Sequence, residues 1–267
     1  MSGRPARRDA VPARPSHPRP VGATDPPRDR RLSLIYGRNA VLEAARAGRV
    51  RRALLARGTE PDPRLEELRH LTRVEEVPPA RIDALAPGAH QGVVAELAPR
   101  AYSTLRQLLE LGPTLLVALD GIEDPQNLGA ILRSAEAAGV DGVIVPEHRS
   151  APLSAAAVKA SSGASEYLRL CRVSGLPSTI SELKRAGIWC AALDPRGELP
   201  VWEFDLRQPV CLVVGGEGHG VHRLVRERCD VRLRLPMRGR IPSLNAAAAV
   251  AIGLYEAMRQ RTGAGGS

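Results

Sequence analysis

From Thr114 onward, short apolar runs alternate with segments that have helical periodicity. The runs TLLVALD, GVIVP and IWCAALD are typical of buried strands, and NLGAILRSAEAAG and LPSTISELKRAG are typical of helices. Parallel strands require a crossover between them, so this βαβ alternation predicts an α/β fold with a parallel sheet over residues 113–262.

A shorter α/β unit is predicted over residues 32–99, because strand-like VRRALLARG and HQGVVAELAP flank a helical PRLEELRHLT. Residues 100–112 read as a connector helix that ends before Pro113. The Pro-studded residues 1–31 and the GAGGS tail, residues 263–267, are predicted to be disordered.

The chain carries 38 Lys and Arg against 29 Asp and Glu, which gives a formal net charge of +9 over 267 residues. This excess suggests a polyanionic partner. Eight Arg and three Asp within residues 1–31 account for more than half of it. Nearly all of the cations are arginine, which fits either phosphate recognition or genomic base composition.

No stretch has the continuous apolar core of a secretory signal or the length of a membrane span. We therefore expect a cytoplasmic protein with no membrane partner; an organelle transit peptide is the alternative interpretation of the leader, although its prolines break the required helix. The four cysteines form no CxxC pair and have no histidine at ligand spacing, so we expect reduced thiols and no metal.

The first candidate motif is DGIEDPQNLGAILR, residues 120–133, where a strand ends and a helix begins. Its Asn127 and Arg133 should lie near the carboxyl edge of the parallel sheet, where ligands collect. In the alternative interpretation, Asn127 only caps the helix and Arg133 only pairs with Glu136.

The second candidate motif is VVGGEGHG, residues 213–220, a buried strand that runs into a Gly-rich turn. Glycines let the backbone approach a ligand closely, and the turn partly resembles a dinucleotide phosphate cradle. The third fingerprint glycine is misplaced, however, and the turn comes late in the chain. His219 and His222 form an HxxH pair that is more often solvated than metal-binding.

The third candidate motif is LPMRGRIPSLN, residues 235–245, followed by an alanine-rich helix. Ser243 is predicted to be the N-cap and Asn245 to fall in the first turn. The small residues 246–251 permit close packing of another subunit.

In this order and at these separations, the three motifs resemble those of the SpoU (TrmH-type) branch of the SPOUT RNA methyltransferases. The matching residues are Asn127, Gly129 and Arg133; Gly215, Gly216, Glu217 and Gly218; and Pro236, Met237, Ser243, Leu244, Asn245, Tyr255, Glu256, Arg259 and Gln260. The segments IYGRNAVLEAARAG and HQGVVAEL are similar to the ribosomal-protein-like (L30e-like) substrate-binding domain of the large-subunit rRNA guanosine 2'-O-methyltransferases. Pro242 and the run Ala246–Ala249 depart from the family pattern.

The resemblance implies a C-terminal trefoil knot, a homodimer whose active site uses both subunits, and transfer of a methyl group from S-adenosylmethionine to a ribose 2'-hydroxyl. The substrate it implies is a guanosine in large-subunit (23S) rRNA, with another rRNA site, a tRNA ribose or antibiotic-resistance methylation as alternatives. The implied catalytic residues are Arg133, Asn127, Ser243, Asn245 and Glu217. The implied cofactor-binding residues are Gly215, Gly216, Gly218, Leu235, Met237 and Leu244.

Arg38, Arg49, Arg51 and Arg52 cluster in sequence near the start of the first unit and are candidate contacts for RNA phosphates. Two other classes of protein remain possible: an RNA-binding module that has lost the reaction, and a dehydrogenase that binds NAD. Retention of the five candidate catalytic residues argues against the first.

Overall fold

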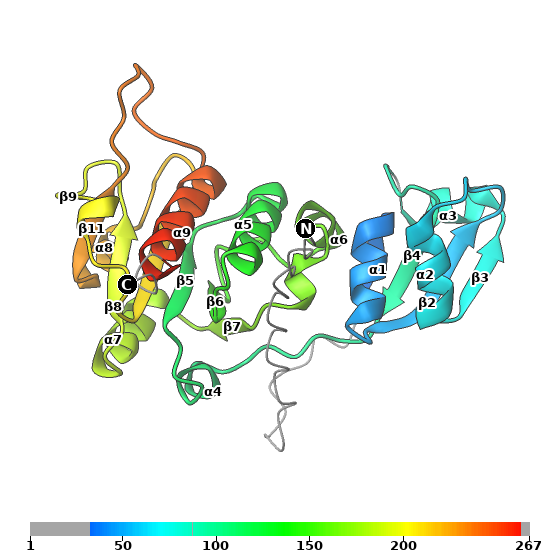
Figure 1. Cartoon of the computed structure of the whole chain (residues 1–267), viewed down its shortest axis with the longest axis horizontal. Helices are drawn as coiled ribbons and strands as arrows, with labels where there is room; N and C mark the ends of the chain where they lie inside the picture. The colour runs from blue at the N-terminus through cyan, green and yellow to red at the C-terminus, as the bar shows by residue number, and fades with distance from the viewer. Residues whose placement is uncertain (1–32, 87, 263–267) are drawn as a thin grey trace, which may run out of the picture.

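The computed structural model describes residues 33–86 and 88–262 and contains two sheets, which lie side by side along the long axis of the molecule (Figure 1). The predicted disordered leader, residues 1–31, and tail, residues 263–267, fall outside the described residues.

The smaller sheet has four strands in the order β1-β4-β2-β3, with β2 and β3 parallel and the other pairs antiparallel. Alternate residues of β2 face opposite sides of the sheet. Ala53 and Leu55 pack under α1 and α2, whereas Leu54 and Ala56 pack under α3. The elements are β1 (Ser33–Tyr36), α1 (Arg38–Arg46), β2 (Val50–Ala56), α2 (Pro63–Leu71), β3 (Val74–Val77), α3 (Pro79–Leu85) and β4 (Val93–Leu97).

The larger sheet has seven strands in the order β7-β6-β5-β10-β8-β11-β9, and every pair is parallel, as predicted. Its strands are β5 (Leu115–Asp120), β6 (Gly142–Pro146), β7 (Leu170–Val173), β8 (Trp189–Leu193), β9 (Leu199–Pro200), β10 (Val210–Gly215) and β11 (Val231–Arg234). The two-residue strand β9 was not expected, because it is too short to show a periodicity.

Helices cover both faces of this sheet (Figure 1). They are α4 (Leu105–Leu109), α5 (Pro125–Ala137), α6 (Ala155–Ala160), α7 (Leu176–Arg185), α8 (Arg223–Arg228) and α9 (Ala246–Thr262), with 3₁₀ turns η1 (Ala164–Glu166) and η2 (Val201–Glu203). Side chains of α5, α6 and α9 pack on one face, and those of α4, α7 and α8 pack on the other. The chain after β5 thus leaves to one face and the chain after β10 to the opposite face, which makes this strand pair the switch point of the sheet.

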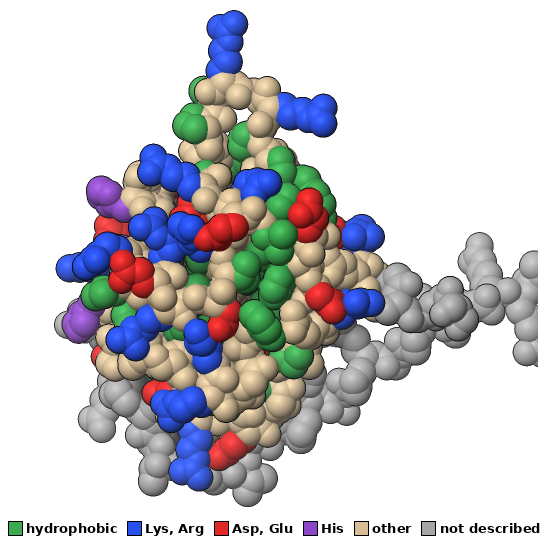
Figure 2. Space-filling view, turned by 90° about the vertical axis from the view of Figure 1, so that its left-hand side faces the viewer, with side chains coloured by type: hydrophobic (Ala, Val, Ile, Leu, Met, Phe, Trp, Pro, Cys, Tyr) green, Lys and Arg blue, Asp and Glu red, His purple; other side chains and the backbone are tan. Residues whose placement is uncertain are grey.

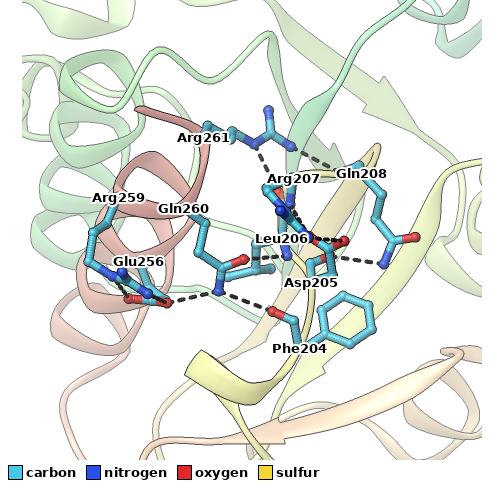
Figure 3. A network of polar contacts seen from close by, with 9 residues as sticks. All are labelled: Phe204, Asp205, Leu206, Arg207, Gln208, Glu256, Arg259, Gln260 and Arg261. Carbon is cyan, nitrogen blue, oxygen red and sulfur yellow. Dashed lines mark hydrogen bonds and ion pairs between the residues drawn. The ribbon is translucent and has the colours of Figure 1, made fainter. Parts of the chain in front are cut away.

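The C-terminal part of α9 is tied to the segment between η2 and β10 (Figure 3). Gln260 accepts a hydrogen bond from the backbone N–H of Leu206 (2.8 Å) and donates to the carbonyl of Phe204 (3.1 Å). Arg261 donates to the carbonyls of Leu206 and Gln208. These contacts fix the end of α9 against the sheet and so help to set where its first residue lies.

Helix α6 lies between the two sheets. On one side it packs against α5, where a Cβ on Gly129 would lie 2.4 Å from the Cβ of Ala160. On the other side, Val158 belongs to the same hydrophobic cluster as the core of the smaller sheet. Lys159 Nζ donates to the carbonyl of Ala89 (2.7 Å) and lies 5.2 Å from the centre of the Tyr36 ring. The smaller unit is therefore packed onto the larger one through α6.

Helix α6, which follows the loop after β6, is only six residues long. It ends at Ala160 because Ser162 and Gly163 have φ values of 52° and 87°, and a 3₁₀ turn follows. A Cβ on Gly163 would lie 2.4 Å from the Cβ of Glu43 in α1. Contact with the smaller unit thus leaves room only for glycine at this bend.

All four cysteines are free, and three of them are buried. Burial raises the pKa of Cys171 and Cys190 to about 12, and it raises the pKa of Cys211 well above its ordinary value. The thiolate is the reactive form, so these side chains are inert core residues.

Candidate active site

The site forms where β5 and β10 end next to each other. Gly215 is the register partner of Asp120, and the Gly216 N–H donates to the Asp120 carbonyl (2.9 Å). The following turns approach so closely that a Cβ on Gly216 would lie 2.0 Å from the carbonyl oxygen of Gly121. Only glycine permits this approach of two backbones.

The Gly-rich turn folds back on itself. A Cβ on Gly215 would lie 1.8 Å from the carbonyl carbon of Gly220, and Gly218 and Gly220 have φ values of 88° and 62°. Gly215 and Gly216 are therefore needed because other backbone atoms lie too close for a Cβ. Gly218 and Gly220 are needed because their backbone is left-handed.

Asp120 is a buried carboxylate that the sequence motifs did not single out. It accepts hydrogen bonds from the backbone N–H of His222 (2.7 Å) and lies 3.0 Å from His222 Nδ1, so it holds the entry to α8. The sequence signal for Asp120 is that it is the one polar residue of an otherwise apolar strand and stands at its carboxyl end. The described residues contain no group of three or more His, Cys, Asp or Glu that could hold a metal.

Asn127, Glu217 and Asn245 meet although they come from three separate segments. Asn245 Nδ2 donates to Asn127 Oδ1 (2.8 Å) and to Glu217 Oε1 (2.6 Å). Asn127 Nδ2 donates to the same carboxylate oxygen at 3.1 Å. The carboxylate is thus fixed by two amide donors, and the three predicted site residues form one network.

The alternative interpretation of Asn127 as a helix cap is wrong, and so is the predicted cap Ser243. Asp124, not Asn127, caps α5, because its carboxylate accepts from the Asn127 N–H (2.9 Å); this leaves the Asn127 side chain free for Glu217. Ser243 does not cap α9, which begins only at Ala246. Asn245 takes that role: its Oδ1 accepts the N–H groups of Ala247 (2.9 Å) and Ala248 (3.3 Å).

Arg133 and Ser243 do not take part in the network of Asn127, Glu217 and Asn245. Ser243 is exposed at the edge of the cavity described next. Arg133 lies further along α5, where its Nη1 donates to Ser162 Oγ (3.2 Å), and it does not line the cavity. Within one chain, the structure therefore does not bring Arg133 to the other candidate catalytic residues.

A cavity of about 640 Å³ opens at the carboxyl ends of β8, β10 and β11. All of the predicted cofactor residues line it: Gly215, Gly216, Gly218, Leu235, Met237 and Leu244. Leu193, Val214 and Leu233 add apolar wall, and Asp194 adds a carboxylate; none of these four was predicted. Apolar walls with exposed backbone groups and a volume in this range suit a nucleoside-sized cofactor.

The four candidate RNA-binding arginines do not form one cluster. Arg38 pairs with Asp62 (2.7 Å) at the end of the sheet where β4 begins, whereas Arg49 lies at its other end, 3.0 Å from Glu166. Arg51 and Arg52 are neighbours in β2, at a point where the register with β4 shifts between Val50 and Arg52. Arg52 pairs with Glu75 (2.5 Å), whereas Arg51 is exposed and has no hydrogen-bond or ion-pair partner within residues 33–86 and 88–262.

A cofactor-sized cavity at the carboxyl ends of parallel strands next to the switch point, beside a fixed carboxylate, is typical of a nucleotide-cofactor enzyme. Residues 114–255 match the SpoU rRNA Methylase family, and residues 34–103 match the RNA 2'-O ribose methyltransferase substrate-binding family. The chain belongs to the SpoU methyltransferase family.

Curated relatives and solved structures that resemble this chain belong to the same family. The chain is 42% identical to the 23S rRNA (guanosine-2'-O-)-methyltransferase RlmB of Pseudomonas aeruginosa, over 85% of this chain and 96% of that protein. The AdoMet complex of the SpoU methyltransferase AviRb from Streptomyces viridochromogenes superposes with a TM-score of 0.74 at 31% identity, over 86% of this chain and 90% of that one. The A. aeolicus TrmH/SpoU tRNA modifying enzyme, 30% identical with a TM-score of 0.52, covers only 60% of this chain and 84% of its own.

These matches confirm the predicted fold class, a SpoU methyltransferase fold with a parallel sheet and an N-terminal substrate-binding domain. They also confirm the predicted cofactor and reaction: the chain is an S-adenosylmethionine-dependent RNA 2'-O-methyltransferase. The NAD-dependent dehydrogenase hypothesis was wrong. No helix of the described residues is long and apolar enough to cross a membrane.

We expect Gly216→Ala to destroy cofactor binding, because the added Cβ collides with the Gly121 carbonyl and must push the two turns apart. The free energy of unfolding should fall by at least about 2 kcal/mol. The matched control is Gly239→Ala, whose Cβ meets no atom within 4 Å. Urea unfolding and calorimetric titration with S-adenosylmethionine measure both effects, and wild-type binding by Gly216→Ala would contradict the assignment.

Two substitutions of Asn245 should separate its two roles. Asn245→Asp keeps the acceptor that caps α9 but replaces the amide donor with a second carboxylate facing Glu217. We expect stability close to that of the wild type with a loss of methylation of about tenfold or more. Asn245→Ala should lose the same activity and also about 1 kcal/mol of stability. Full activity of the Asp variant would show that the bridge is dispensable.

Proposed function

We propose that this enzyme methylates the ribose 2'-hydroxyl of a guanosine in large-subunit (23S) rRNA. The observation that carries the proposal is the extent of the relationship. The P. aeruginosa enzyme, which is named for that reaction, matches along 96% of its length, so the likeness takes in both sheets. The tRNA modifying enzyme matches 60% of this chain. Methylation of a tRNA ribose is therefore the second candidate. It is the weaker one because the similarity to that enzyme covers a smaller part of this chain.

We propose a division of labour between the two units. Residues 113–262 bind the cofactor and catalyse, residues 32–99 form an L30e-like domain that binds RNA, and residues 100–112 connect them. Arg51 is the strongest of the four candidate RNA contacts, because its charge has no carboxylate partner in the described part of the chain. Action on ribosomal RNA supports the predicted cytoplasmic location.

The cavity residues fit S-adenosylmethionine. Leu235, Met237 and Leu244 supply apolar contacts, and the turn Gly215–Gly218 supplies backbone groups at close range. The bound cofactor supplies a methyl group that a sulfonium already activates, so the protein's task is to align a ribose hydroxyl and to accommodate its proton. Asn127 and Asn245 hold Glu217 in a fixed orientation beside the cavity, and Ser243, which lies at the rim, is the residue proposed to contact the ribose.

Arg133 is the proposed residue that acts at the hydroxyl. A guanidinium stays protonated, so Arg133 orients the hydroxyl and stabilises developing negative charge, with an RNA phosphate as the proton acceptor. It does not line the cavity of its own chain. This placement supports the predicted homodimer, in which a second protomer contributes Arg133 to the cavity.

The surface of α9 also supports a dimer. One side of the helix is buried through Val250, Leu254 and Ala257, while Ile252 and Tyr255 on the other side are 44% and 47% exposed. We propose that these exposed apolar residues and the small Ala248 pack against the partner, with the C-terminal segment forming the predicted trefoil knot.

Arg133→Ala should abolish methylation while the dissociation constant for S-adenosylmethionine stays within a few fold, because Arg133 is assigned to the hydroxyl and not to the cofactor cavity. The control is Ser162→Ala, which removes only the present partner of Arg133 and should keep activity. Calorimetry and methyl transfer to RNA give the two readouts. Parallel loss of cofactor binding and activity would refute this role.

The substrate is tested by mapping 2'-O-methyl groups in total RNA from a strain that lacks the gene. We expect one guanosine in 23S rRNA to lose its methyl group and to regain it on complementation with the wild type but not with Arg133→Ala. Loss of a methyl group from tRNA, with 23S rRNA unchanged, would favour the second candidate.

A further inference from the structure

The segment between β11 and α9, residues 235–245, stands out from the body of the molecule (Figures 1 and 2). Its two stems line the cofactor cavity, with Leu235 and Met237 on the way out and Pro242 and Leu244 on the way back. The residues between the stems do not line the cavity. We call residues 238–241 the loop tip; all of them are exposed.

The loop tip carries two cations without acceptors. Arg238 and Arg240 have no hydrogen-bond or ion-pair partner in the described part of the chain, and Figure 2 shows basic side chains extending from the end of the segment. The arginines just before it in β11 differ. Arg232 pairs with Glu198, and Arg234 donates to the carbonyls of Gly197 and Glu198. The positive charge at the tip is therefore available to an external anion.

An apolar side chain accompanies these charges. Ile241 is 70% exposed, more than any other large hydrophobic residue described. A free Arg pair beside an exposed aliphatic residue suits RNA, because guanidinium groups bind phosphates with directed hydrogen bonds and aliphatic side chains pack on unstacked bases. An acidic protein surface would not require the apolar group.

We infer that the loop tip is a second RNA-binding element, which acts at the catalytic cavity itself. Arg238 and Arg240 bind phosphates that flank the target nucleotide, and Ile241 packs against a neighbouring base. Because both stems of the segment contact the cofactor cavity, RNA bound at the tip is held with its ribose at the mouth of that cavity. The inference rests on the proposed function, since it names the part of the methyltransferase unit that positions the rRNA.

The test compares full-length wild type with Arg238→Gln/Arg240→Gln. Two fewer phosphate contacts should raise the KM for RNA about tenfold near physiological salt and lower the slope of log affinity against log salt by about 1.4. The dissociation constant for S-adenosylmethionine should not change. Ile241→Ser should raise KM while leaving the salt slope intact, since it removes no charge.

The matched control is Arg106→Gln/Arg185→Gln, which removes the same charge from α4 and α7; these helices lie below the larger sheet in Figure 1, whereas the loop rises above it. Its KM and salt slope should equal those of the wild type. An unchanged KM and slope in the Arg238/Arg240 variant would overturn the inference, as would a fall in the sedimenting mass of that variant, because the tip would then bind a second copy of the chain.

The proposed substrate and the loop can fail separately. If wild-type protein transfers no methyl group to a 23S rRNA fragment, the proposed substrate is wrong. The equilibrium affinity and salt slope of the two double variants, measured on whichever RNA the wild type methylates, still decide the role of the loop tip.

Discussion

The close approach of two backbone turns at the ends of β5 and β10 determines the rest of the site. Gly216 lies against Gly121 with no space for a side chain, and from there the chain leaves to opposite faces of the sheet through α5 and α8. The first turn of α5 presents Asn127, and the Gly-rich turn presents Glu217, so that the two side chains meet over the gap. A wider separation of these strand ends would break the hydrogen bonds among Asn127, Glu217 and Asn245. It would also displace Gly215 and Gly216, which line the cavity.

Asn245 links the stability of α9 with the geometry of the candidate site. Its carbonyl oxygen satisfies the first N–H groups of α9, and its amide group orients the Glu217 carboxylate. The far end of α9 is fixed by Gln260 and Arg261, so the position of Asn245 depends on contacts at both ends of a 17-residue helix. Substitutions far from the cavity, at the end of α9, can therefore change the geometry of the site.

Much of the fold and part of the site could be predicted from the sequence. The apolar runs and their helical crossovers are local patterns, and the three motifs identified the residues that line the cavity or bridge to it. Asn127 does not cap α5 because Asp124, three positions earlier, takes that role, and Ser243 does not cap α9 because the helix begins only at Ala246, after Asn245. The carboxylate partners of Arg38 and Arg49 are 24 and 117 residues away, and no local pattern indicates them.

Helix α6 belongs structurally to both units, since it contributes Val158 to the core of the smaller sheet and packs Ala160 on Gly129 of α5. The two units are therefore joined by the packing of α6 as well as by the chain that connects them. A chimera that takes residues 34–103 from a relative would also need that relative's residues 155–167. A substitution at this junction in one unit therefore requires a matching change in a segment of the other unit more than 50 residues away.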